Sequence, residues 1–194
     1  SLLYVANKLD SRNFDNYKNN EIILATVHRR ENWGKPLANI CDGLKMILEK
    51  HLNITIVIPM HPNKDVRKII KQNLSKFSRV KLIDPLPYDD LVHLIKKSKL
   101  VLTDSGGLQE EAPTLGKPVL VLREKTERTE ALDAGTTRLV GTKASTIFEA
   151  SDYLLTHDDE YKKMANLSNP YGDGNSSKLI VDECLKFLDT IINF

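Results

Sequence analysis

Short apolar runs alternate with longer segments of helical period through most of the chain. The runs span three to seven residues rich in Val, Ile and Leu, a length and composition typical of strands buried on both faces. The segments between them repeat apolar residues every three or four positions, as helices covering a sheet do. The pattern predicts an α/β fold with a Rossmann-like, doubly wound parallel sheet. The predicted strands are Ile22–Val27, Ile54–Met60, Val80–Ile83, Leu100–Thr103, Val119–Leu122 and Arg138–Val140; the predicted helices are Pro36–His51, Asp65–Leu74, Asp89–Lys97, a segment from Gly107 to before Lys117, Ser145–Leu155, Asp159–Ala165 and Ser176–Ile192.

The beginning of the chain differs from this regular alternation. Residues 2–9 have the pattern of the end of an amphipathic helix, and a polar connector follows over residues 10–20. Because the chain opens on Ser1 and has neither a helix cap nor a charged signal region there, we expect a piece of a longer protein. We therefore divide it into an interdomain helix and connector, residues 1–20, and one Rossmann-like domain with C-terminal helices, residues 21–194.

Composition narrows the functional classes. The chain has 194 residues, 41% hydrophobic and 28% charged, which fits one globular core. No apolar run approaches the roughly 20 residues of a membrane helix, so we expect a soluble protein, and the use of cysteine described below fits a reducing cytoplasm. The 28 basic and 26 acidic residues are scattered, which argues against nucleic acid as a partner. Cys41 and Cys184 lie far apart without a metal-binding spacing, so we predict neither a disulfide framework nor a metal site.

The strongest chemical signal follows the fourth predicted strand. Ser105, Gly106 and Gly107 form a small-residue turn into a helix, which leaves backbone N–H groups open to a phosphate or diphosphate. Glu111 lies about one turn inside that helix, where a carboxylate can accept hydrogen bonds from ribose hydroxyls. The alternative is a tight glycine turn with acidic residues that only stabilise the helix dipole.

Charged residues follow the first and second predicted strands. His28, Arg29 and Arg30 come directly after the first, a placement that favours an anionic ligand and an acid or base, although a solvated basic loop has the same composition. His61 follows the second strand and is interpreted either as a ligand contact or as a cap for the next helix.

Two further loops could complete a nucleotide site. The loop from Asp84 to Tyr88 holds two prolines, and its free main-chain groups are suited to reading the edge of a base. Arg128, after the fifth strand, could neutralise phosphate; a solvated charge run is the alternative there.

Taken together, these motifs closely resemble the non-hydrolysing UDP-N-acetylglucosamine 2-epimerases. The resemblance runs from about Glu21 to the last helix in the family's order and spacing. The matching segments are His28–Asn32, His61–Asn63, Thr103–Pro113, Leu115–Val119, Thr126–Arg128 and Asn169–Gly174.

The resemblance implies the C-terminal, UDP-binding half of a glycosyltransferase-B type enzyme with two Rossmann-like domains. Such enzymes interconvert UDP-N-acetylglucosamine and UDP-N-acetylmannosamine by eliminating and re-adding UDP, without a metal or other cofactor, for cell-envelope polysaccharides. The acidic residues that handle the C2 proton belong largely to the missing N-terminal domain. We therefore expect this chain to bind UDP without turnover, and the full-length enzyme to be a homodimer.

The resemblance also assigns roles by motif position. His28 is the candidate catalytic residue, and Arg29, Arg30 and His61 are possible activator or cleft contacts. Thr129 stands where the family usually has Pro, so we expect a more mobile loop around Arg128. The residues expected to bind UDP are His28, Leu86, Tyr88, Ser105, Gly106, Gly107, Glu111 and Arg128.

Three other functions stay open. A hydrolysing epimerase, which releases free N-acetylmannosamine, shares much of the pattern. The donor domain of a glycosyltransferase shares the fold but generally has other signatures around the phosphates. A nucleotide-binding module without catalysis is the third.

Overall fold

The computed structural model describes residues 2–8, 20–172 and 174–192, and contains a parallel sheet of six strands. The strand order is β3-β2-β1-β4-β5-β6, and every neighbouring pair is parallel. In the centre of the sheet, Ile23 of β1 lies opposite Ile56 of β2 and Leu100 of β4. This confirms the predicted Rossmann-like sheet. The strands are β1 (Glu21–Thr26), β2 (Ile54–Pro59), β3 (Val80–Ile83), β4 (Ser98–Thr103), β5 (Val119–Val121) and β6 (Thr137–Leu139).

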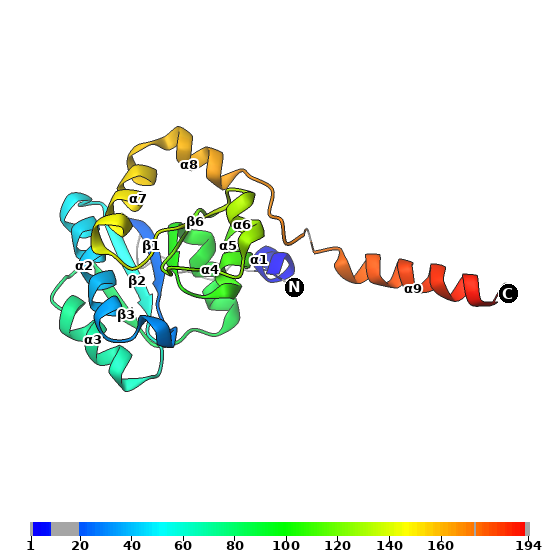
Figure 1. Ribbon diagram of the computed structural model, residues 1–194. Helices are drawn as coiled ribbons and strands as arrows, with labels where there is room; N and C mark the ends of the chain where they lie inside the picture. Colours follow the sequence, from blue (N-terminus) through cyan, green and yellow to red (C-terminus); the bar gives the residue numbers. More distant parts are fainter. Residues whose placement is uncertain (1, 9–19, 173, 193–194) are drawn as a thin grey trace.

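Helices cover both faces of the sheet (Figure 1). On one side lie α2, α3 and α7, with α8 beyond them, and on the other lie α4, α5, α6 and the N-terminal α1. The last helix, α9, extends away from the rest of the chain. The helices are α1 (Leu2–Lys8), the 3-10 turn η2 (Arg30–Asn32), α2 (Lys35–Lys50), α3 (Lys64–Leu74), α4 (Tyr88–Lys97), α5 (Gly106–Thr114), α6 (Thr129–Asp133), α7 (Ala144–Thr156), α8 (Asp158–Ala165) and α9 (Ser176–Ile192).

The central strands are buried on both faces because their side chains pack into a hydrophobic layer on each side of the sheet. In β1, Ile23 and Ala25 pack into the layer under α2, α3 and α7, whereas Ile22 and Leu24 pack into the layer under α4 and α5. This alternation of faces is the two-residue period of a strand. It explains why these strands have continuous apolar sequences rather than alternating apolar and polar ones.

Most predicted elements are present, with ends that shift by one or two residues. β4 begins at Ser98, two residues before the predicted start, and Thr129–Asp133 forms a helix that the sequence pattern did not predict. The predicted N-terminal helix is present as α1, whose Ala6 packs against Val92 of α4. The predicted connector lies largely outside the described residues, as does Asp173 of the predicted turn. No helix in the described ranges is long and apolar enough to cross a bilayer.

The strand order creates a crevice at the carboxyl ends of β1 and β4. The connection after β1 enters α2 on one face of the sheet, and the connection after β4 enters α5 on the other. Two loops that leave neighbouring parallel strands in opposite directions open a crevice between them, where α/β proteins bind ligands. His28 and Ser105 therefore meet at this point.

Candidate functional site

A buried carboxylate joins the two loops of the crevice. Asp104 is fully buried directly after β4. Its Oδ2 accepts hydrogen bonds from the backbone N–H groups of His28 and Arg29 at 3.0 and 2.9 Å, and from Nδ2 of Asn32 at 2.9 Å. Its Oδ1 lies 3.1 Å from the His28 nitrogen and 3.8 Å from Nε2 of the same residue. Asp104 thus fixes the main chain at His28 and Arg29.

Further hydrogen bonds tie the same loops to the sheet. Nδ2 of buried Asn32 also donates to the Leu122 carbonyl at 3.0 Å, so η2 is attached to the ends of both β4 and β5. The hydroxyls of Thr26 and Thr103 lie 2.6 Å apart, and the Thr103 hydroxyl accepts from the Ser105 N–H at 2.9 Å. These hydrogen bonds hold the loops after β1 and β4 against the strand ends.

The N-terminus of α5 faces the crevice. Ser105 is the N-cap residue, and its side chain makes no capping hydrogen bond, so the first N–H groups of the helix stay open to an anion. A Cβ added at Gly106 would lie 3.3 Å from Nη2 of Arg128 and 3.3 Å from Oε1 of Glu127. A side chain at Gly106 would therefore crowd the Arg128 guanidinium at the start of the helix.

A small, mostly apolar pocket of about 230 Å³ lies beside that helix start. Its size suits one planar ring. The rings of His28 and His61 stack at its edge, with centroids 5.9 Å apart. The pocket is lined by Thr26, Val27, His28, Pro59, Met60, His61, Pro62, Pro85, Leu86, Leu91, Ser105 and Leu108.

Tyr88 and Glu111 meet at the outer side of α5. The Tyr88 hydroxyl donates to Oε1 of Glu111 at 2.8 Å. Burial, together with this hydrogen bond, raises the pKa of Tyr88 to about 12, so the phenol remains the donor at neutral pH. The second oxygen of Glu111 is then left to accept from a ligand hydroxyl.

The structure brings most of the predicted site residues to one edge of the sheet. His28, His61, Leu86 and Ser105 line one pocket. Arg29 joins the edge of the site through Glu127, at 3.4 Å, while Arg30 is exposed on η2.

Two local predictions need correction. His61 does not cap the helix after β2: the N-cap is Asn63, whose Oδ1 accepts from the N–H groups of Asp65 and Val66. An Asn side chain reaches these amides from the N-cap position, which is two residues beyond His61. Tyr88 does not belong to the loop after β3, where the sequence pattern places it, but is the first residue of α4, and its hydroxyl contacts Glu111. The prediction that the main chain of this loop reads a base stays a prediction.

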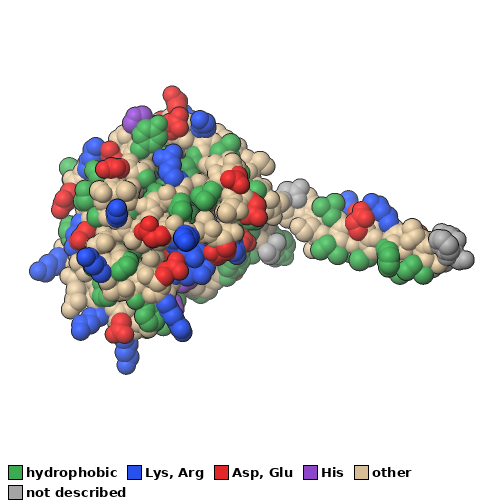
Figure 2. All heavy atoms as spheres, in the orientation of Figure 1, with side chains coloured by type: hydrophobic (Ala, Val, Ile, Leu, Met, Phe, Trp, Pro, Cys, Tyr) green, Lys and Arg blue, Asp and Glu red, His purple; other side chains and the backbone are tan. Residues whose placement is uncertain are grey.

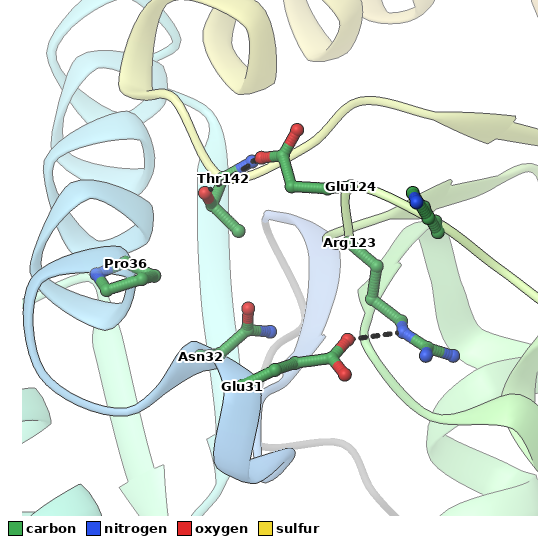
Figure 3. A pocket seen from close by; sticks show the side chains of 7 residues that line it. Glu31, Asn32, Pro36, Arg123, Glu124 and Thr142 are labelled. Carbon is green, nitrogen blue, oxygen red and sulfur yellow. Dashed lines mark hydrogen bonds and ion pairs between the residues drawn. The ribbon is translucent and has the colours of Figure 1, made fainter.

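Sequence reasoning missed the residues that hold the site together. Asp104 and Asn32 stand within the quoted motifs without an assigned role, and their carboxylate and amide at strand ends were the available signal. Arg123 was also missed; its Nε donates to Oε1 of Glu31 at 2.6 Å, between η2 and the segment after β5 (Figure 3). These two residues line a second cavity of about 300 Å³, together with Asn32, Pro36, Glu124, Lys125 and Thr142.

The comparisons with known proteins show which family the chain resembles. A family model described as UDP-N-acetylglucosamine 2-epimerase matches residues 2–185. The UDP-N-acetylglucosamine 2-epimerase of Neisseria meningitidis is 49% identical over 168 residues, which are 87% of this chain and 45% of that protein. The chain thus spans about half the length of the curated relatives it matches.

Solved structures show the same relationship. The structure of the Neisseria meningitidis UDP-GlcNAc 2-epimerase bound to UDP-GlcNAc has a TM-score of 0.88 and 44% identity, over 95% of this chain and 52% of that one. An S. aureus protein in a co-structure with UDP has a TM-score of 0.88 and 41% identity, over 94% and 50% of the two chains. Since the family model covers nearly the whole sequence, this chain belongs to the UDP-N-acetylglucosamine 2-epimerase family.

Proposed function

We propose that this chain is the UDP-binding half of an enzyme that interconverts UDP-N-acetylglucosamine and UDP-N-acetylmannosamine, and that alone it binds UDP without turnover. The observation that carries the proposal is the meeting of three features in one crevice. These are a helix N-terminus without a side chain at Gly106, the Arg128 guanidinium beside it, and a ring-sized pocket next to both. Relatives of 44% and 41% identity have been solved with UDP-GlcNAc and with UDP.

Each feature suits one part of UDP. The 230 Å³ pocket takes the uracil, with Leu86 on its wall, and Glu111 accepts from the ribose hydroxyls. The open N–H groups of α5 and the Arg128 guanidinium take the diphosphate. A charged ligand at a helix N-terminus is stabilised by both the dipole and the hydrogen bonds.

The proposed reaction keeps UDP attached to both the substrate and the product. A base removes the proton from C2 while the bond between C1 and the UDP oxygen breaks, which yields a glycal and UDP. UDP then adds back to C1, and a proton is delivered to C2 on the face opposite to the one that lost its proton, which gives the 2-epimer. The negative charge that develops on the departing UDP falls next to α5 and Arg128, so these groups stabilise the transition state more than the ground state. His28 lines the same crevice, and we assign it as the candidate catalytic residue of this half.

The remaining half would supply the carboxylates that move the C2 proton. The exposed apolar side chains of α9 support the existence of a further domain, because a lone helix does not normally leave such a surface in water. Figure 2 shows hydrophobic side chains along this helix, and Phe187 is 65% exposed. The others are Leu179, Ile180, Val181, Leu185, Leu188 and Ile191.

Calorimetric titration tests the binding part of the proposal. We expect UDP to bind in the presence of a metal chelator, with UMP and ADP weaker. Equal affinity for ADP and UDP would contradict the assignment of the ring pocket to uracil. Loss of binding in chelator would contradict the metal-independent diphosphate site.

Product analysis tests the reaction. We expect no epimerisation by this chain alone, and retention of UDP on the product of the full-length enzyme. Release of free N-acetylmannosamine by the full-length enzyme would instead establish the hydrolysing reaction. In the full-length enzyme, His28→Ala should lower kcat more than it raises KM, and the reverse would make His28 a binding residue only.

A further inference from the structure

A continuous chain of ion pairs connects η2 to the start of α5. Glu31 of η2 accepts from Nε of Arg123, and Nη1 of Arg123 donates to Oε2 of Glu127 at 2.7 Å. Oε1 of Glu127 accepts from Nη1 of Arg128 at 3.1 Å. Arg123 is the buried link, with 8% of its surface exposed, so this end of the chain is anchored in the protein. Figure 3 shows its pair with Glu31.

Two carboxylates hold Arg128 from different sides. Glu127 accepts from Nη1, and Oε1 of Glu110, on α5, accepts from Nε at 2.7 Å. The third nitrogen, Nη2, is the one that lies against Gly106 at the start of α5. A planar guanidinium held through two of its nitrogens has its third direction fixed. The structure therefore aims Nη2 at the place where the helix N–H groups are open to an anion.

We infer that Glu127 and Glu110 are positioning residues that orient Arg128 so that its Nη2 meets the β-phosphate of UDP. The inference rests on the proposed function, because it assigns these residues a part in UDP binding. Glu127 is suited to this task because it stays ionised: a hydrogen bond from its own backbone, followed by that from Arg123, keeps its pKa below the usual range. Glu110 reaches the same guanidinium from the ligand-binding helix itself.

The Glu127 carboxylate itself lies close to the start of α5, where the diphosphate is proposed to bind. A carboxylate close to a phosphate site repels the ligand, so removing its charge should tighten UDP binding if it has no other role. If the carboxylate instead orients Arg128, its removal frees the guanidinium, and UDP binding should weaken. The two possibilities predict opposite changes in Kd.

The experiment measures the Kd for UDP and for UMP by calorimetry on the chain and on Glu127→Gln. We expect the UDP Kd to rise by about ten-fold, which corresponds to the loss of about one well-placed charged hydrogen bond, and the UMP Kd to change much less. Glu110→Gln should act in the same direction. The matched control is Glu124→Gln, which removes the same charge from the same segment but whose carboxylate accepts from Thr142 instead, at 3.1 Å; its UDP Kd should stay the same or fall.

A second background separates positioning from general damage. In Arg128→Ala the guanidinium is gone, so adding Glu127→Gln should no longer weaken UDP binding. Thermal unfolding of each variant checks that it is folded. An unchanged or tighter UDP Kd in Glu127→Gln, or an equal loss in both backgrounds, would overturn the positioning role. Failure of the parent chain to bind UDP would instead overturn the proposed function and this inference with it.

Discussion

Replacing the buried carboxylate at the end of β4 should loosen the whole crevice. Asp104→Asn keeps the shape of the side chain, and its oxygen can still accept at the Oδ2 position from His28, Arg29 and Asn32. The amide NH2, however, then lies at the Oδ1 position, 3.1 Å from the His28 nitrogen, where a donor faces a donor. The substitution therefore removes the negative charge and creates one unfavourable contact.

The magnitude follows from the number of hydrogen bonds. A hydrogen bond to a charged group contributes about 1 kcal/mol more than a neutral one, so the three bonds at Oδ2 lose about 3 kcal/mol together. A neutral amide costs less to bury than a carboxylate, which offsets about 1 kcal/mol of that loss. The donor–donor contact at the Oδ1 position adds to this loss, so the free energy of unfolding should fall by at least about 2 kcal/mol. In a chain of this length, that lowers Tm by about 4–8 °C.

Thermal unfolding followed by circular dichroism checks this expectation. The control is Asp133→Asn, an exposed aspartate at the end of α6, which should change the free energy of unfolding by less than about 0.5 kcal/mol. A Tm of Asp104→Asn within about 1 °C of the parent chain would refute the reasoning, because it would mean that the carboxylate does not hold the loops. If the loops do loosen, UDP affinity should fall in the same variant.

Three further outcomes can be checked with simple measurements. Gly106→Ala should raise Tm slightly, since Ala is the better helix residue, but weaken UDP binding about ten-fold in calorimetry because the new Cβ would lie 3.3 Å from the Arg128 guanidinium. Hydrogen bonds from Lys50, which has the larger effect, and from His51 at the end of α2 lower the pKa of Asp152 in the folded chain. The stabilisation by ionised Asp152 should therefore be complete above the unfolded pKa of about 3.9 and be lost as the pH falls through the lower folded pKa. The difference in stability between Asp152→Asn and the parent chain should therefore shrink steadily as the pH is lowered through the acid range, and a constant difference would contradict this. Burial raises the pKa of Cys41 to about 12, so a thiol reagent should label only Cys184 in the folded chain and both cysteines after denaturation; prompt labelling of both would contradict the structure.

The sequence was sufficient for the type and order of most elements because the sheet is buried on both faces. Short, continuous apolar runs that polar loops bound on both sides, such as that of β1, clearly indicate buried strands. The start of β4 was missed because Ser98 is polar yet buried, with its hydroxyl donating to the Leu94 carbonyl. The helix from Thr129 to Asp133 was missed because five residues beside a charged run show no helical period.

The position of the candidate site was predictable for a similar reason. Chemically active residues that follow successive strands must meet at one edge of a parallel sheet, which is how His28, Ser105 and Arg128 were found. The residues that orient them were not, because their partners are distant in sequence: Asp104 binds groups 72 to 76 positions away. No local pattern carries such a pairing. The mobility expected from Thr129 stays a prediction; the residue begins α6, a position that also suits the Pro usual in the family.

The pairing of β1 with β4 has a consequence for how the chain folds. Asp104 and His28 are 76 residues apart, so forming the crevice closes a loop that contains β2, β3 and the helices between them. Closing a loop of that length carries a large entropic cost before any contact compensates for it, which slows folding. The crevice therefore has no early, local precursor. Binding of a ligand that requires the crevice will therefore report the fraction of completely folded molecules. A chain cut anywhere between β1 and β4 is expected to lose the site as a whole.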